Sequence, residues 1–290
     1  MSKPLISLEA VTHTYTPGTS FAVTALDQVS LTIHKGEFVG LIGPTGSGKS
    51  TLVQHLNGLL RPTSGHVRLE GRDIWERGMS LKQVRQRIGL VFQYPEHQLF
   101  DETVAADVGF GPRNAGLTGQ AVEDRVTEAL ALVGLGGALA DRSPFALSGG
   151  QMRRAALAGV LAMRPEVLVL DEPASGLDPR GRDEILGHVL GLHRLGLTVV
   201  LVSHNMEDIA RLATRIVVMH QGRVLMDGTA REVFARTDAL EAVGLSAPPM
   251  TLLARELRRR GLAVPPDLIS VDEGFQAVLK ALGKEARQGA

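Results

Sequence analysis

The sequence predicts an α/β fold in which a parallel sheet is covered by helices on both faces. Short apolar runs with the length of buried strands, such as residues 167–170 and 198–203, alternate with helical patterns, such as residues 180–195. This alternation is typical of a parallel sheet, because each crossover between parallel strands needs a helix. Another apolar run, residues 37–42, ends at a glycine-rich loop that leads into a helical pattern over residues 49–60.

The N-terminal part of the chain shows a different pattern. Short β-rich runs are separated by turn signals there, which predicts an antiparallel layer. We expect its strands over residues 5–16, 21–26 and 29–33. Further strands are expected around residues 66–69 and 88–92.

The middle of the chain is helical in composition. Residues 101–143 carry Gly and Pro at 109–112 and 134–137, where we expect interruptions, and another helix is expected over residues 151–163. Nearer the C-terminus, two runs joined at Gln221-Gly222 predict a closing hairpin.

After Gly228 the composition changes, and Pro-Pro pairs bracket an amphipathic helix over residues 250–260. A last helix is expected around residues 273–282. We therefore divide the chain into a main domain, residues 5–229, and a small helical appendage, residues 230–290.

Composition narrows the classes of function. The chain has 290 residues, 31 Lys and Arg, 31 Asp and Glu, and no cysteine. A net charge of zero argues against a general nucleic-acid binder, although a local basic patch stays possible. Without cysteine there is no disulfide framework and no thiolate metal site. We find no signal peptide and no apolar run of the ~18 residues that a membrane span needs, so we expect docking at a membrane only through another protein.

The glycine-rich loop fits a phosphate-binding pattern, G-x-x-x-x-G-K-[ST]. Its glycines let backbone N–H groups turn inward at a helix N-terminus and bind an anion. The lysine adds positive charge for the β- and γ-phosphates, and the serine hydroxyl suits Mg²⁺. A plain glycine turn is the alternative, but it would not require Lys and Ser at those positions. The loop and the residue after it are Gly43, Pro44, Thr45, Gly46, Ser47, Gly48, Lys49, Ser50 and Thr51.

A second candidate follows the apolar run at 167–170, which ends in Asp171 and Glu172. A buried strand places such residues at the carboxyl edge of the sheet, where ligands bind in open α/β folds. Asp171 is expected to hold Mg²⁺, and Glu172 to orient or deprotonate the attacking water. Two acids at the start of a helix are the alternative, which the phosphate loop upstream makes much weaker.

These two motifs predict a P-loop NTPase core and leave kinases, GTPases, helicases and ABC proteins open. Five further features resemble the ABC ATPases and occur in that family's order over residues 5–230. They are an aromatic residue in the N-terminal layer, a Q-loop glutamine, the signature Leu-Ser-Gly-Gly-Gln, a D-loop and a switch histidine: Tyr15, Gln93, residues 147–151, residues 175–178 and His204.

The resemblance implies roles for these residues. Tyr15 would stack on adenine, and Gln93 would contact the nucleotide and Mg²⁺. His204 would face the γ-phosphate. The signature residues would contact ATP held by a second subunit, so that two chains enclose two nucleotides. This shared contact involves Ser148, Gly150, Gln151 and the D-loop residue Asp178.

Each feature alone also has an ordinary structural interpretation. Ser148 can cap a helix, His204 can be a hydrogen-bonded structural histidine, and Gln93 can be a loop amide. Tyr15 can be strand packing. The conjunction of all five favours the ABC interpretation, whose expected ligands are ATP and Mg²⁺. The expected architecture adds a helical signature subdomain to the core, the antiparallel N-terminal layer and the C-terminal helical appendage.

Within the ABC family, residues 91–112 resemble the ATPases of energy-coupling factor (ECF) transporters, which import vitamins or transition-metal ions. Residues 151–154, 159–165 and 244–261 also resemble that group, most of all the second of its two ATPase paralogues. Residues 174–175 depart from it, with Ala-Ser in place of the usual Thr-Ala.

The ECF resemblance implies three partners and a place in the cell. They are a second ATPase subunit (a paralogue or a second copy), a transmembrane coupling protein and a membrane-embedded substrate-binding protein, with no nucleic acid. The place is peripheral, on the cytoplasmic face of the cell membrane. Three rivals stay open: a soluble ABC ATPase acting on nucleic acid or ribosomes, a regulatory subunit without turnover, and an importer that uses a soluble binding protein.

Overall fold

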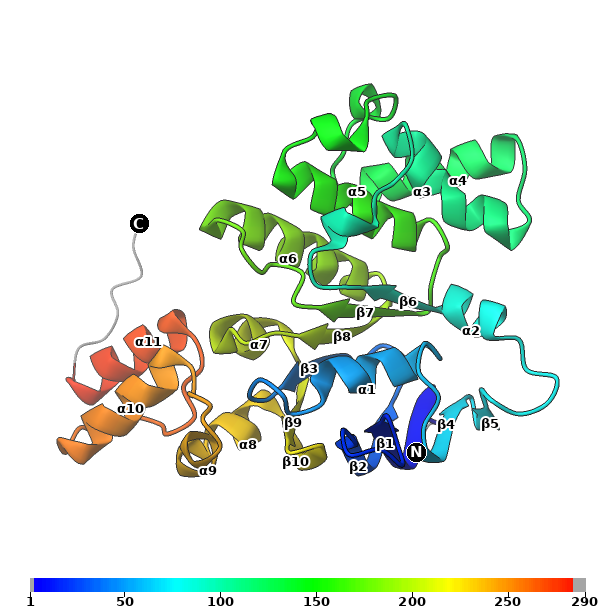
Figure 1. Cartoon of the computed structure of the whole chain (residues 1–290). Coiled ribbons are helices and arrows are strands. Elements are labelled where there is room, and N and C mark those ends of the chain that lie inside the picture. Colours follow the sequence, from blue (N-terminus) through cyan, green and yellow to red (C-terminus); the bar gives the residue numbers. More distant parts are fainter. Residues whose placement is uncertain (1–2, 284–290) are drawn as a thin grey trace.

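The structure, a computed structural model, describes residues 3–283. Its centre is a six-stranded sheet in the order β10-β9-β3-β8-β7-β6, in which only β10 runs antiparallel to its neighbour (Figure 1). The parallel sheet that the alternating runs predict is confirmed. Its strands are β3 (Phe38–Ile42), β6 (Ile88–Val91), β7 (Val167–Asp171), β8 (Thr198–Val202), β9 (Arg215–His220) and β10 (Arg223–Gly228).

The central sheet separates two hydrophobic cores. Alternate residues of β7 point to opposite faces, so Val167 and Val169 pack with the N-terminal layer and with α1 (Lys49–Leu56). Leu168 and Leu170 pack with the helices of the other face. The strand is buried on both sides, which explains its unbroken apolar run. The helices of the second face include α6 (Pro179–Arg194) and α7 (Met206–Leu212).

The N-terminal layer is an antiparallel sheet in the order β2-β1-β4-β5, as predicted. The expectation of two strands over 21–26 and 29–33 is wrong, because one continuous strand runs from residue 23 to residue 33. Gln28 has a left-handed backbone (φ 50°) and its N–H donates to Thr12 Oγ1 at 3.1 Å, so the turn signal marks an irregularity within the strand. The strands are β1 (Ile6–Tyr15), β2 (Val23–Ile33), β4 (Ser64–Leu69) and β5 (Arg72–Asp73).

A separate group of helices lies beyond the β6–β7 edge of the sheet, at the top of Figure 1. The interruption expected at 134–137 is confirmed, but the one at 109–112 is wrong because a helix runs through Pro112 to Ala115. A Cβ on Gly109 would lie 3.1 Å from Val122, and one on Gly111 would lie 2.6 Å from Met163. These glycines therefore allow close helix packing and do not end the helix. The group comprises α3 (Val104–Ala115), α4 (Gln120–Leu132), α5 (Gly149–Leu161) and the 3₁₀ turns Gly137–Leu139 and Pro144–Ala146, while α2 (Leu81–Arg87) precedes β6.

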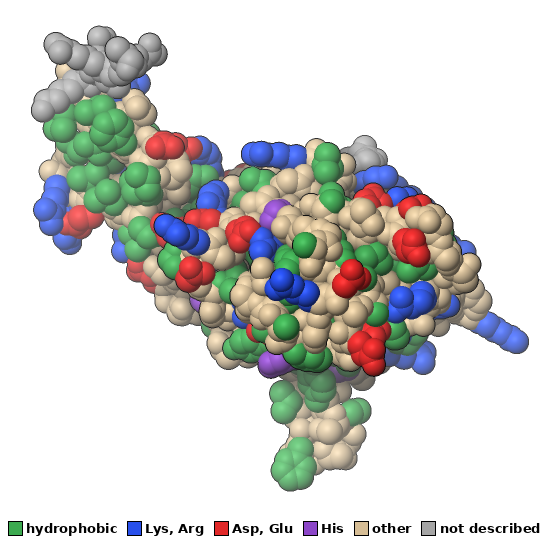
Figure 2. Space-filling model, turned by 90° about the horizontal axis from the view of Figure 1, so that it is seen from above, with side chains coloured by type: hydrophobic (Ala, Val, Ile, Leu, Met, Phe, Trp, Pro, Cys, Tyr) green, Lys and Arg blue, Asp and Glu red, His purple; other side chains and the backbone are tan. Residues whose placement is uncertain are grey.

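The C-terminal helices divide into two pairs by their packing. Phe234 and Leu240, in the first pair, belong to the main core. The second pair encloses a small core of its own, built on Ala254, Val264 and Leu268. The lobe formed by this pair carries exposed apolar side chains, at the left of Figure 2. The helices are α8 (Ala230–Phe234), α9 (Thr237–Ala242), α10 (Pro249–Arg259) and α11 (Val271–Ala281).

The boundary at residues 229 and 230 stays a prediction, since α8 packs on the main domain. Among the described residues, no helix has both the length and the apolar character that a membrane crossing requires.

Candidate nucleotide site

The residues predicted to bind phosphate and metal and to activate water lie at the carboxyl ends of four neighbouring parallel strands. Along the edge β3-β8-β7-β6, the phosphate loop (residues 43–50) follows β3, and His204 lies two residues after β8. Asp171 ends β7 and Glu172 follows it, while Gln93 lies two residues after β6. Strand order thus brings together residues that are up to 161 positions apart in the chain (204 − 43).

The phosphate loop exposes the start of α1 to a ligand. The helix begins after Gly48, whose φ is 100°, and no side chain caps it. A Cβ on Gly48 would lie 2.4 Å from the carbonyl oxygen of Ala25, and Gly46 also has a left-handed backbone (φ 79°). Only glycine adopts these conformations without strain. The loop therefore presents backbone N–H groups to an anion at a helix N-terminus.

Lys49 lies over this loop. Its Nζ donates hydrogen bonds to the carbonyl oxygens of Gly43 at 2.8 Å and Pro44 at 3.0 Å. Burial lowers the pKa of Lys49, while the carboxylates of Glu172 and Asp171 act against that shift. The ammonium group thus lies within the field of Asp171, which ends β7, and of Glu172, which follows it.

Asp171 is 7% exposed and lies next to the start of α1. Burial raises the pKa of Asp171, and the Ser50 hydroxyl and Lys49 partly offset this rise. A carboxylate beside a hydroxyl at a helix start is an all-oxygen donor set, which is the set that Mg²⁺ prefers. The residues present therefore fit the expected ion.

Glu172 and His204 form a close pair. His204 Nδ1 donates to Glu172 Oε2 at 2.7 Å, and the Glu172 backbone is left-handed (φ 53°) while its N–H donates to Val202 O at 3.0 Å. Burial raises the pKa of Glu172, and the adjacent His204 opposes that rise. Both residues line a cavity of about 220 Å³ together with residues 173–177. A raised pKa and a position at the cavity wall suit a carboxylate that accepts a proton.

Tyr15 lies beside α1. Its hydroxyl is 3.1 Å from Thr51 Oγ1, and its ring is partly open to solvent, with 41% of the residue exposed. The ring edge of His13 packs against it at 4.6 Å between centroids. Gln93 is exposed just beyond β6. Both residues are therefore placed at the rim of the site, in agreement with the roles expected for them, and the roles themselves stay predictions.

The signature residues form a helix start of their own. Ser148 caps α5, its Oγ accepts from Gln151 N at 3.3 Å, and Gln151 Oε1 accepts from Ser148 N at 3.0 Å. A Cβ on Gly150 would meet no atom within 4 Å, so this surface is open. Asp178 caps α6 by accepting from Gly181 N at 3.1 Å. The capping interpretation thus holds within this chain, and contact with a second chain's nucleotide stays a prediction.

Sequence reasoning gave no role to Arg153 or Glu96. Arg153, in α5, is 5% exposed, and its Nε donates to Glu96 at 3.0 Å. An arginine at a core-facing position among small and apolar residues was the available signal, because a buried guanidinium requires a partner.

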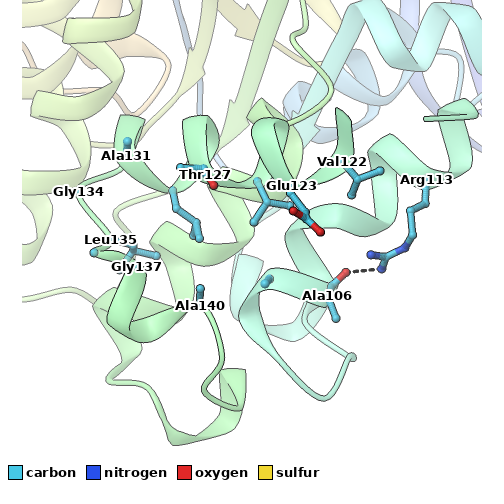
Figure 3. A pocket seen from close by; sticks show the side chains of 14 residues that line it. Ala106, Arg113, Val122, Glu123, Thr127, Ala131, Gly134, Leu135, Gly137 and Ala140 are labelled. Carbon is cyan, nitrogen blue, oxygen red and sulfur yellow. Dashed lines mark hydrogen bonds between the residues drawn. The ribbon is translucent and has the colours of Figure 1, made fainter. Parts of the chain in front are cut away.

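A second cavity lies away from this site. It measures about 690 Å³, is mostly apolar, and is lined by α3, α4 and residues 134–140 (Figure 3). It shares no lining residue with the strand edge that carries Lys49 and Asp171. Its lining is mostly apolar and contains neither the phosphate loop nor the acidic residues at the end of β7, so we do not assign it to ATP.

The sequence also matches a protein family and several named relatives. The family model described as "ABC transporter" matches residues 26–175. The chain is 60% identical to the energy-coupling factor transporter ATP-binding protein EcfA2 of Symbiobacterium thermophilum, over 98% of both chains. It is 52% identical to the protein of the same name from Caldanaerobacter subterraneus subsp. tengcongensis, over 96% of this chain and 97% of the relative.

Solved structures extend the comparison. CbiO1 from Clostridium perfringens, described as part of the ABC transporter complex CbiONQ, is 36% identical with a TM-score of 0.73, over 84% of this chain and 95% of that one. A dimeric ATP-binding cassette in a post-hydrolysis state, bound to ADP and Pi, is 32% identical with a TM-score of 0.70, over 78% of this chain and 99% of that one. The chain therefore belongs to the ABC transporter family, as an ATP-binding subunit of the ECF type whose ATPase activity is coupled to transport.

Proposed function

We propose that the chain hydrolyses Mg-ATP at the carboxyl ends of β3, β8 and β7, with Glu172 as the general base. The observation that carries the proposal is the pairing of Glu172 with His204 beside the phosphate loop. Lys49 and the N–H groups at the start of α1 bind the β- and γ-phosphates, and Tyr15 packs against adenine. Ser50, Asp171 and Gln93 would hold Mg²⁺, which when bound supplies positive charge beside the phosphate oxygens.

The chemical step is attack of water on the γ-phosphorus with ADP as the leaving group. Glu172 accepts a proton from the attacking water, and burial favours this transfer because it raises the pKa of the carboxylate. His204 donates from Nδ1 to Oε2 of Glu172, and as an imidazolium it would also donate from Nε2 to the γ-phosphate. Lys49 stabilises the charge that develops on the transferred phosphoryl group.

We further propose that two such subunits enclose the nucleotides between them. Ser148, Gly150, Gln151 and Asp178 would then face the ATP bound by the partner subunit. The dimeric cassette with ADP and Pi supports this arrangement, because it is a structural relative over 78% of this chain. The second subunit is either another copy or a paralogue.

The transport partners are proposed from the relatives. Their names place them in energy-coupling factor transporters, and CbiO1 is described as part of a complex. We infer a transmembrane coupling protein and a membrane-embedded binder for a vitamin or transition-metal ion, with this chain at the cytoplasmic face of the cell membrane. Mass spectrometry of proteins that co-purify with the chain from membranes in mild detergent tests this. Recovery of ribosomal proteins alone would contradict it.

The role of Glu172 is tested by Glu172→Gln in the assembled transporter. Turnover is expected to fall about a hundredfold or more while ATP affinity is retained. In the parent protein the ATPase rate is expected to fall as the pH drops through the pKa of Glu172. Burial raises this pKa above the value of an ordinary glutamate. The residual ATPase rate of Glu172→Gln should not show this fall at low pH, because the variant has no carboxylate to protonate. Glu207→Gln, at an exposed position in α7, serves as the control. Normal turnover by Glu172→Gln would remove Glu172 from catalysis.

A further inference from the structure

One buried guanidinium joins three separate segments. Arg153 of α5 donates from Nε to Glu96 Oε2 at 3.0 Å and from Nη2 to Glu96 Oε1 at 3.2 Å. Its Nη1 donates to the backbone carbonyl oxygens of Pro173, at 3.4 Å, and Ser175. Each of the three guanidinium nitrogens therefore has an acceptor, and the planar group fixes their relative directions.

The two ends of this link lie next to functional segments. Glu96 belongs to the 3₁₀ turn η1 (Pro95–Gln98), which begins two residues after Gln93. Pro173 follows Glu172 directly, and Ser175 lies three residues after it, where its N–H donates to Glu172 O at 3.1 Å. A single side chain thus runs from η1 to the turn that holds the proposed general base.

The pair is largely removed from water. The side chain of Arg153 is 6% exposed and that of Glu96 is 19% exposed. Although burial opposes it, hydrogen bonding to Arg153 holds the pKa of Glu96 below its ordinary value. Buried ion pairs are seldom better for stability than apolar residues of the same volume, so stability alone does not account for the pair.

The backbone at Glu172 needs support from its surroundings. A left-handed φ of 53° on a residue other than glycine is unfavourable and persists only where neighbouring contacts hold it. Arg153 supplies two of the contacts on the turn that follows. Moving η1 would draw Glu96 and the guanidinium away from the carbonyl oxygens of that turn.

We propose that Arg153 is a positioning residue that couples the location of η1 to the orientation of the Glu172 carboxylate. The inference rests on the proposed role of Glu172. Glu96 acts on the site only through Arg153, and Arg153 acts through the backbone of residues 173–175. Arg153 belongs to α5, the helix that Ser148 caps, and lies five residues after that serine.

A double-mutant cycle in the intact transporter tests this coupling. Arg153→Met is expected to lower kcat about tenfold or more, because small displacements of catalytic groups have large effects on rate. KM and the affinity for a fluorescent ATP analogue stay within about twofold of the parent, since neither residue contacts the phosphate loop. Glu96→Gln lowers kcat less, because the carbonyl contacts remain. The double variant is no slower than Arg153→Met alone, because the two residues act in series.

Arg164→Met is the matched control, because it removes another Arg–Glu pair (Arg164–Glu128) from the same helical group and touches no site segment. Its kcat is expected to be unchanged. Arg153→Lys keeps the charge but cannot hold both ends of the link, so it restores only part of the rate. If Arg153→Met does not fold, the kcat of Arg153→Lys is used in its place.

Two results would overturn the inference. The first is an unchanged kcat in Arg153→Met, or in Arg153→Lys if Arg153→Met does not fold. The second is a loss of kcat in the double variant that equals the product of the two single losses. Glu172→Gln in the same assay separates the two proposals. If that variant is inactive and Arg153 is dispensable, only the coupling fails. If Glu172→Gln retains turnover, the catalytic assignment itself fails.

Discussion

Two helix starts in this molecule are proposed to bind ATP, and they are built differently. The start of α1 has a glycine as its cap, no side-chain acceptor on its N–H groups, and Lys49 as its first residue. The start of α5 is closed by a reciprocal capping box between Ser148 and Gln151, with no charged side chain at its cap or in its first three positions. Both ends carry the positive pole of a helix dipole, so the difference lies in what already occupies it.

This difference implies an order of binding. At α1 a phosphate meets N–H groups that no side chain of the described chain caps, together with an ammonium group. At α5 a phosphate must share or replace the contact between Ser148 Oγ and the N–H of Gln151. In the proposed dimer we therefore expect the phosphate loop to be the stronger site and the signature the weaker one, so that ATP binds first to its own chain and then to the facing chain.

Of these changes, removal of the Lys49 ammonium group is expected to have the largest effect on ATP binding. Lys49→Met is expected to weaken ATP binding about a hundredfold, because charge-assisted hydrogen bonds to phosphate are lost. Titration with a fluorescent ATP analogue measures the affinity. Lys82→Met, at an exposed lysine of α2, is the control and should bind normally. Equal affinity in both variants would show that the backbone of the loop alone sets the strength of the site.

The two glycines at these helix starts offer a paired test of backbone strain. Gly48→Ala is expected to lower the free energy of unfolding by about 1–3 kcal/mol and to weaken ATP binding, because φ is 100° and the new Cβ would lie 2.4 Å from Ala25 O. Gly149→Ala has open space around the new Cβ and should stay within about 0.5 kcal/mol of the parent. Denaturant titration measures both, and equal losses would contradict the geometry.

Loss of the capping box at the start of α5 is expected to have the smallest effect of the three changes. Ser148→Ala is expected to cost about 1 kcal/mol of stability, the usual value for loss of a cap. ATP affinity of the isolated chain stays unchanged, while ATP-dependent association with the second subunit weakens. Ser270→Ala removes a similar cap from α11, at a distance from the site, and should reduce stability without altering association. If both variants associate normally with ATP, the signature serves only as a helix cap.

The sequence predicts this architecture well because its strongest signals are local. Each central strand is a short apolar run, and the phosphate loop is a single stretch of eight residues with fixed spacing. The acidic residues after β7 and His204 after β8 could be assigned to the same edge, since parallel strands end together. Their meeting in the structure follows from strand order, while their chemical roles stay predictions.

What the sequence does not predict depends on contacts between distant segments. Gly109 and Gly111 were expected to interrupt a helix, but they are small because neighbouring helices lie against them. Gln28 was expected in a turn, but pairing across β1 carries the strand through it. The pair of Arg153 and Glu96 spans 57 positions and has no fixed local spacing, so no local pattern identifies it.

Strand β8 lies between β3 and β7 although it follows both of them along the chain. During synthesis the ribosome therefore releases the complete phosphate loop and both acidic residues before the strand that sets them side by side exists. Until residues 198–202 insert between the two strands, Lys49 and Asp171 belong to segments that are not neighbours. The catalytic centre can therefore be complete only after β8 and the His204 that follows it have been synthesised.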